Sequence, residues 1–192
     1  MIELLENPAF FLFPILLIAS FIDLRQHRIP NWLNLITLVL GLTLQFSFFH
    51  GSGLLNGLGG FAVGFISFIP FYALRAMGAG DVKLMAVIGC FLTPLQTFEA
   101  VLATIIAGGF LGIMVLIARR GVGRYVKRYI LMAQTFFYMR KVLPIAPASD
   151  EPARTRFPYA VAIAAGTFYT LWSHGYLLKA MQQSQKLLML LS

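Results

Sequence analysis

The sequence predicts an all-α integral membrane protein with about six transmembrane helices in one bundle. Of its 192 residues, 59% are hydrophobic and only 11% are charged, whereas a soluble domain has roughly 25% charged residues. The mean hydropathy is +0.80. Many of the apolar residues gather in runs close to the roughly 20 residues that a helix needs to cross the hydrocarbon core.

Six apolar runs are expected to cross the membrane. In chain order they are 8–24, 31–49, 57–74, a run that begins after Asp81, 98–118 and 157–178. The first run lacks the basic segment of a signal peptide and is expected to be retained. The fourth is the shortest, because Thr93 and Pro94 interrupt it after residues 84–92. It must therefore continue through Pro94 to reach span length, or form a short or kinked span.

A single membrane-embedded domain is expected over 1–192, with a core at 8–118, a basic loop at 119–156 and a last helix at 157–178. The loop holds nine of the 15 Lys and Arg residues and mixes them with aromatic residues. This mixture predicts an interfacial amphipathic helix that lies on anionic lipid. Contact with the leader of a substrate is the alternative interpretation.

The basic residues also predict the orientation of the chain. The first, third and fifth connections between the runs hold 13 of the 15 Lys and Arg residues, whereas 50–53 and 93–99 hold none. We therefore expect the odd connections on the cytoplasmic side of the membrane and both termini on the other side. The net charge of +8 then reflects topology and contact with anionic lipid, and nucleic acid is not an expected partner.

The cysteine and histidine residues do not indicate a metal site or a reactive thiol. The single cysteine, Cys90, lies inside an apolar run and is expected to be a small core residue. His27, His50 and His174 lie far apart, and no HExxH or comparable ligand spacing occurs. Neither a metal nor an organic cofactor is therefore expected.

Two acidic residues lie at the cytoplasmic edges of runs, namely Asp23 and Asp81. They are 58 residues apart, yet the expected topology returns the chain to the same face. Two carboxyl groups that share a site titrate as a coupled pair holding one proton, which is the arrangement of aspartic proteases. Simpler roles stay open, since Asp23 could pair with Arg25 or cap a turn, and Asp81 could cap the fourth helix.

The neighbours of Asp81 are compatible with a reactive carboxyl group. Gly78 and Gly80 allow backbone conformations that other residues resist, and they leave room for a substrate strand. Lys83 could stabilise the ionised carboxylate or contact lipid headgroups.

Three segments resemble the type IV prepilin peptidases, a family of membrane aspartic proteases. "GAGDVKL" (78–84) is similar to their GxGD motif, which presenilin-like proteases share. "DLRQHRIPNWLN" (23–34) resembles the segment after their first helix, and "FPYAVAIAAG" (157–166) resembles the opening of a late helix. Together the three segments cover most of the chain in the order of the family.

The resemblance implies a role for each matching residue. Asp23 and Asp81 match the two catalytic aspartates. The supporting positions are the motif glycines Gly78 and Gly80, the basic residue Lys83, and the turn formed by Ile29, Pro30 and Asn31, in which Pro30 leads into the second helix. Longer members of the family carry paired CxxC motifs associated with methylation, which these 192 residues lack. The chain resembles the short form of tight-adherence (Flp-type) pilus systems, and the resemblance does not extend to methyltransferase activity.

The expected function is that of an inner-membrane aspartic endopeptidase. It would cleave the basic leader from prepilins or pseudopilins at the cytoplasmic face of the membrane, with membrane lipids as its other partners. The alternatives are a preflagellin-type peptidase and a non-enzymatic membrane component of assembly or transport. A transporter should show polar groups near the middle of the membrane or an inverted repeat, and neither is visible in the sequence.

Overall fold

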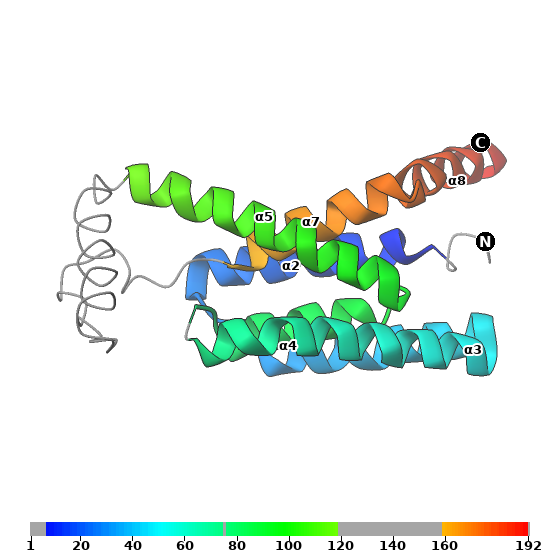
Figure 1. Cartoon of the computed structure of the whole chain (residues 1–192). Coiled ribbons are helices and arrows are strands. Elements are labelled where there is room, and N and C mark those ends of the chain that lie inside the picture. Colours follow the sequence, from blue (N-terminus) through cyan, green and yellow to red (C-terminus); the bar gives the residue numbers. More distant parts are fainter. Residues whose placement is uncertain (1–6, 75, 119–158, 192) are drawn as a thin grey trace, which may run out of the picture. The chain divides into compact units, whose positions relative to one another are not determined.

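A computed structural model describes residues 7–74, 76–118 and 159–191 of the chain. All secondary structure in these residues is helical: α2 (Pro8–Gln26), α3 (Asn31–Ala73), α4 (Ala79–Gly89), α5 (Pro94–Ala118), α7 (Tyr159–Ser173) and α8 (Tyr176–Leu191) (Figure 1). The prediction of an all-α protein is thus confirmed for the described part. The interfacial helix expected in 119–156 falls outside it.

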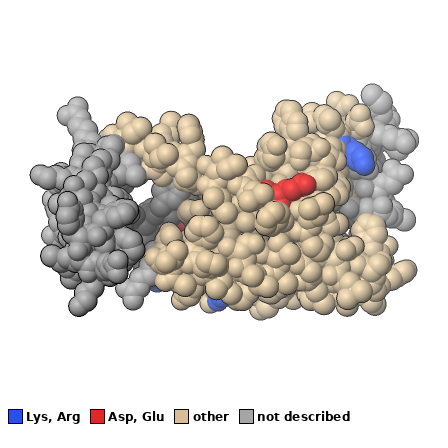
Figure 2. All heavy atoms as spheres, in the orientation of Figure 1, with Lys and Arg blue, Asp and Glu red and all other residues tan. Residues whose placement is uncertain are grey.

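The described residues belong to two units. One comprises 7–108 with 159–191, and the other contains 109–118, the last part of α5. Within 7–74, 76–118 and 159–191, three segments are long and apolar enough to cross a membrane: Pro8–Gln26, Asn31–Ala73 and Pro94–Val115. Their exposed side chains are largely apolar, as Phe21, Ile36 and Ile106 illustrate. Figure 2 shows correspondingly few charged residues on one face. An apolar exterior of this kind suits contact with lipid.

Helix α3 contains both the second and the third predicted runs. Its backbone leaves the helical conformation at His50, where φ is 51° and ψ is −136°. A Cβ atom added to Gly57 would lie 3.4 Å from a side-chain carbon of Leu42. In a straight helix these two residues would be about 22 Å apart. The chain therefore reverses near His50, and the arms on either side of it run antiparallel (Figure 1).

Helix α4 is shorter than the fourth predicted run and begins earlier. It has 11 residues and starts at Ala79, so Asp81 lies in its first turn. The continuation through Pro94 was wrong, because a new helix starts there. The Thr93 N–H donates to Gln96 Oε1 (3.1 Å), and the Gln96 N–H donates to Thr93 Oγ1 (3.4 Å). This capping box, with Pro94 at the first helical position, starts α5.

Protein surrounds α4 on nearly all sides. Its side chains from Leu84 to Ile88 are at most 3% exposed, and α4 packs against α3 and α7. The closest approach is to α3, where a Cβ atom added to Gly64 would lie 2.6 Å from the Met85 carbonyl oxygen, and one added to Gly60 would collide with the Gly89 carbonyl oxygen. Small residues at this spacing let two helix backbones touch.

The last predicted run, 157–178, is broken in two. Helix α7 ends at Ser173, and Gly175 adopts the left-handed conformation with φ of 71° before α8 begins. Glycine populates this region without the steric cost that a Cβ atom imposes. Helix α8 was not predicted, because its lysines and glutamines weaken the apolar signal of the sequence.

Candidate active site

Asp81 is held by the first turn of its own helix. Gly78 is the N-cap of α4, with an extended backbone (φ −83°, ψ 157°), and its N–H donates to Asp81 Oδ2 at 2.9 Å. Asp81 is thus the third helical residue reaching back to the cap, rather than the cap itself as the simpler interpretation held. Its side chain is buried, and the residue is only 8% exposed.

The ionisation of Asp81 reflects that burial. The residue lies outside the three candidate membrane-spanning segments. Loss of solvent raises its pKa from 3.8 to about 6, because water stabilises the charged form better than the protein interior does. The Gly78 N–H opposes this shift, and the negative charge of Asp23 adds to it. The two carboxylates therefore lie within range of each other's charge.

Asp23 lies near the end of α2 and is 4% exposed. Its Oδ2 atom accepts the backbone N–H of Ala160, in the first turn of α7, at 3.0 Å. The proposed pairing with Arg25 is not seen, since the Arg25 guanidinium lies over the Phe21 ring, 4.6 Å from its centroid. A residue 137 positions away in the sequence thus supplies the donor to Asp23.

The two carboxylates are bound in the same manner. Each uses Oδ2 to accept one main-chain N–H from the beginning of a helix, α7 for Asp23 and α4 for Asp81. Within the described residues, neither Oδ1 atom accepts a hydrogen bond or counts among the fully buried polar atoms without a partner. The second oxygen of each group therefore stays accessible to a proton, a water molecule or a substrate.

The other residues singled out in the sequence surround Asp81. A Cβ atom added to Gly80 would lie 3.2 Å from Ile29 Cβ, and one added to Gly78 would lie 3.3 Å from Asp81 Oδ2. Neither glycine has a positive φ. The prediction that these positions need glycine for an unusual backbone conformation was therefore wrong. Glycine suits these positions because neighbouring atoms lie close to them. The space beside Gly80 is occupied by Ile29, so it is not open to a substrate.

Lys83 and Asn31 connect the beginnings of two helices. The Lys83 ammonium donates to Asn31 Oδ1 at 3.0 Å. Asn31 is the first residue of α3, and Pro30 precedes it as the N-cap with φ of −68°. The Lys83 charge is exposed and lies at Asn31, so this contact fixes the first turn of α4, next to Asp81, against α3.

Ala160, whose N–H binds Asp23, and Ser20, whose hydroxyl donates to the Ala160 carbonyl oxygen at 3.4 Å, were not predicted from the sequence. Their contacts use main-chain atoms of Ala160, and main-chain donors carry no residue signature. The one available signal was the segment 157–166, which resembled the family without suggesting a role. The neighbouring Tyr159 packs edge-to-face on Phe68, with ring centroids 6.3 Å apart.

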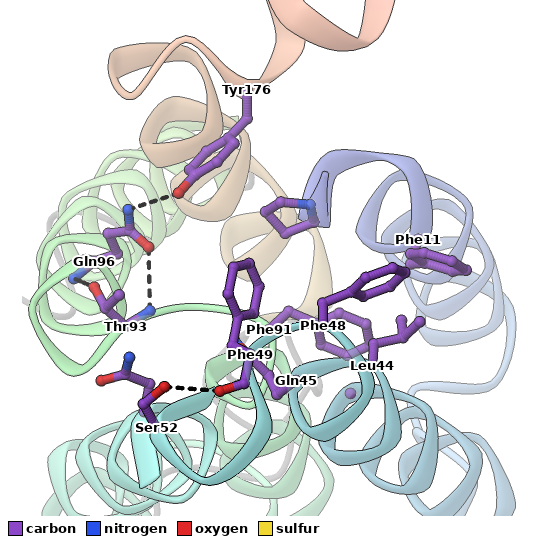
Figure 3. A pocket seen from close by; sticks show the side chains of 13 residues that line it. Phe11, Leu44, Gln45, Phe48, Phe49, Ser52, Phe91, Thr93, Gln96 and Tyr176 are labelled. Atoms are coloured by element: carbon purple, nitrogen blue, oxygen red, sulfur yellow. Dashed lines mark hydrogen bonds between the residues drawn. The ribbon is translucent and has the colours of Figure 1, made fainter. Parts of the chain in front are cut away.

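A pocket of about 320 Å³ lies at the other end of the same helices (Figure 3). Aromatic rings, including Phe11, Phe48 and Phe91, line one side of it, and the uncharged polar residues Gln96 and Tyr176 lie at its rim. Phe11 precedes Asp23 by 12 residues and Phe91 follows Asp81 by 10, which is about 18 and 15 Å along a helix. The pocket is therefore separate from the two carboxylates.

Neither end offers an evident metal site. No cluster of three or more His, Cys, Asp or Glu side chains suited to a metal ion occurs in the described segments. The Cys90 thiol is fully buried in the core.

Comparison with known proteins identifies the family of the chain. A profile of the type IV leader peptidase family matches residues 10–113, more than half of the chain. A prepilin leader peptidase/N-methyltransferase of Myxococcus xanthus (strain DK1622) is 31% identical over 118 residues, which are 58% of this chain and 35% of that relative. The chain thus spans about a third of the relative's length, and no solved structure matches it. Because the family profile matches more than half of the chain, over a range that contains Asp23, Asp81 and all of α3 and α4, we conclude that the chain belongs to the type IV leader peptidase family.

Proposed function

We propose that the chain is a membrane aspartic endopeptidase that removes the leader peptide of type IV prepilins, with Asp23 and Asp81 as its catalytic pair. The observation that carries this proposal is the pair of buried carboxylates, each held through one oxygen by a helix N-terminus. Family membership supports prepilin processing as the reaction.

The proposed chemistry divides one proton between the two groups. The ionised carboxylate takes a proton from a water molecule, which attacks the carbonyl carbon of the scissile peptide bond. The protonated carboxyl group donates its proton to the carbonyl oxygen, which gives a tetrahedral gem-diol. Collapse of this intermediate breaks the C–N bond, as the carboxyl group that took the proton from water passes it to the leaving nitrogen and the other carboxylate regains a proton from the gem-diol. Burial favours the protonated form of Asp81, whose pKa rises to about 6. The accessible Oδ1 atoms are the ones that would contact the water and the substrate.

The proposed topology places this pair near the cytoplasmic face of the bacterial inner membrane. The supporting observation is the concentration of Lys and Arg in the odd connections. Six crossings would be formed by α2, the two arms of α3, a short crossing by the part of α4 that follows Asp81, α5 and α7. The pocket would then lie near the opposite face.

Accessibility of cysteines tests this orientation. Ser52→Cys and His27→Cys lie at exposed positions at opposite ends, and Cys90→Ala supplies the background. In intact spheroplasts an impermeant thiol reagent should label position 52 only, whereas position 27 should react after permeabilisation. The reverse pattern would place the carboxylates outside the cytoplasm.

We propose the Flp-type prepilins of tight-adherence systems as substrates, on the resemblance of the motifs alone. A preflagellin-type peptidase would use the same chemistry on another substrate, and a non-enzymatic membrane component is the alternative from another class. We propose only the peptidase reaction, because the matched relative bears both activities in its name and the match covers 35% of it.

Purified protein in lipid vesicles provides the decisive test. It should convert a Flp-type prepilin to a shorter product, and N-terminal sequencing of that product should place the cut after the basic leader. Cleavage of preflagellin alone would favour the second substrate class. Absence of cleavage with every prepilin and preflagellin would leave the non-enzymatic alternative.

A further inference from the structure

The first turn of α7 contacts α2 at two points through one residue. The Ala160 N–H donates to Asp23 Oδ2 at 3.0 Å, and the Ser20 hydroxyl donates to the Ala160 carbonyl oxygen at 3.4 Å. Ser20 and Asp23 are three residues apart and therefore lie on the same face of α2. Ala160 itself is fully buried. Both main-chain groups of Ala160 are thus used in seating α7 on α2.

The contact at Asp23 is electrostatic as well as steric. The first N–H groups of a helix have no acceptor within the helix, and the helix dipole favours a negative charge beside them. The first turn of α7 contains no acidic residue of its own. Asp23 supplies the missing carboxylate from α2, in the way that Asp81 supplies it within α4.

This contact decides where the carboxylate can point. With Oδ2 bound to Ala160, the carboxylate plane of Asp23 is restrained and Oδ1 is left for chemistry. The titratable groups whose charges act together with Asp23 include Asp81 on α4 and His27 after the end of α2, and Tyr159, next to Ala160, lies within range of the Asp81 charge.

We propose that Ala160 is a positioning residue, whose main-chain N–H orients Asp23 for peptide-bond cleavage. The proposal rests on the proposed function of the chain and adds to it a third, non-titrating participant. A purely structural contact would lower the amount of folded protein. A positioning contact lowers kcat while leaving folding and substrate binding intact, because a small displacement of a reacting group costs rate rather than affinity.

An ester substitution isolates the N–H group. Incorporation of lactic acid at Ala160 by nonsense suppression replaces the N–H with an oxygen atom and keeps the methyl side chain. The matched control is the α-hydroxy analogue of valine at Val161, which removes the next N–H of the same helical turn. We expect the ester at 160 to lower kcat by about 10- to 100-fold, the usual range for a hydrogen bond to a charged group, with KM unchanged within about twofold. The control should stay within about twofold of the unmodified protein in both constants.

Amide exchange tests the contact without reference to cleavage. In the protein in lipid nanodiscs, Asp23→Ala should accelerate deuterium uptake at the Ala160 amide by at least about tenfold, because the acceptor is lost. Asp81→Ala should leave this amide unchanged. Unaltered exchange in Asp23→Ala would overturn the contact itself.

The two experiments separate the possible failures. Altered exchange together with full kcat in the 160 ester would make the contact structural only and overturn the positioning role. Equal losses in the 160 and 161 esters would do the same. If the unmodified protein cleaves no prepilin, the proposed function is wrong. The positioning role of Ala160 is then wrong as well, even if the exchange experiment confirms its hydrogen bond to Asp23.

Discussion

The two ends of α2 and α4 accommodate polar groups in different ways. At one end, two buried carboxylates accept main-chain N–H groups from helix N-termini. At the other end, uncharged side chains pair with each other, as Gln96 does with the Tyr176 hydroxyl at 3.0 Å. The acidic residue there, Glu99, contacts the His174 ring, and both side chains are partly exposed.

The two ends differ in the free energy that is lost when their polar groups are buried. A buried carboxylate is tolerated only with a donor beside it, whereas amides and hydroxyls satisfy each other at little cost. Asp81, buried and with a raised pKa, is a candidate for a reactive group. The comparison therefore supports the proposal that cleavage takes place at the Asp23–Asp81 end, and we expect changes at the pocket end to leave cleavage nearly intact.

The largest expected effect comes from removing either carboxylate. Asp23→Asn and Asp81→Asn should each lower cleavage by at least about 1,000-fold, because an amide acts neither as a general base nor as the donor of the shared proton. The double variant should lose little more, since the pair acts as a unit. The measurement is the fraction of prepilin processed at matched protein abundance.

Glu99→Gln is the matched control at the pocket end and should process prepilin as the unmodified protein does. Robust processing by either aspartate variant would remove the aspartic-protease proposal.

A smaller loss of processing is expected when a larger side chain is placed in the first turn of α4. Gly80→Val should reduce processing by roughly 100-fold, since added side-chain atoms press on Ile29 and displace Asp81, and misplacement of about 1 Å has an effect of this size. Ala79→Val is the neighbouring control, because Ala79 is exposed. Equal activity of the two variants would show that the contact of Gly80 with Ile29 is unimportant.

The burial of Asp81 predicts a change in stability that depends on pH. Its pKa is raised from 3.8 to about 6 in the folded chain, so folding is favoured below pH 3.8 and this advantage is lost as the pH rises through about 6. Asp81→Asn should therefore raise the free energy of unfolding at pH 8, by on the order of 3 kcal/mol at most.

The same substitution should have little effect at pH 4, where Asp81 is protonated in the folded protein. Thermal unfolding in detergent at the two pH values provides the measurement. A loss of stability at pH 8 would mean that the charge of Asp81 stabilises the fold.

The smallest expected effects on processing come from one substitution near the carboxylates and one at the pocket. Lys83→Ala removes an exposed hydrogen bond to Asn31, and an exposed charge contributes modestly. We expect processing to fall about threefold. Gln96→Leu at the pocket should stay within about twofold in processing rate, because it removes one neutral hydrogen bond. A larger loss from Gln96→Leu than from Lys83→Ala would give the pocket a part in catalysis.

Sequence patterns predicted what depends on side-chain identity and missed what depends on the main chain. Apolar runs located α2, both arms of α3 and α5, and charge counting singled out Asp23 and Asp81. The Ala160 donor was not predictable, because every residue except proline carries an N–H. The break at Gly175 was missed because its glycine resembles those that pack between helices.

The boundary between α4 and α5 was recognised only in part, as an interruption at Thr93 and Pro94. Thr93 and Gln96 have the spacing of a capping box, with Pro94 between them. Because residues 84–92 are too few for a full span, continuation through Pro94 was considered beside a short or kinked span. The local signal for a helix start was therefore the better guide.

The enclosure of α4 has a consequence for how the protein responds to its bilayer. A helix that faces lipid adapts by tilting when the hydrocarbon thickness changes. Helix α4 packs against α3 and α7 with its side chains almost fully buried, so we expect changes in thickness to reach Asp81 through these neighbouring helices. The depth of Asp81 is then set by protein packing, and the same arrangement would persist in thin and thick membranes alike.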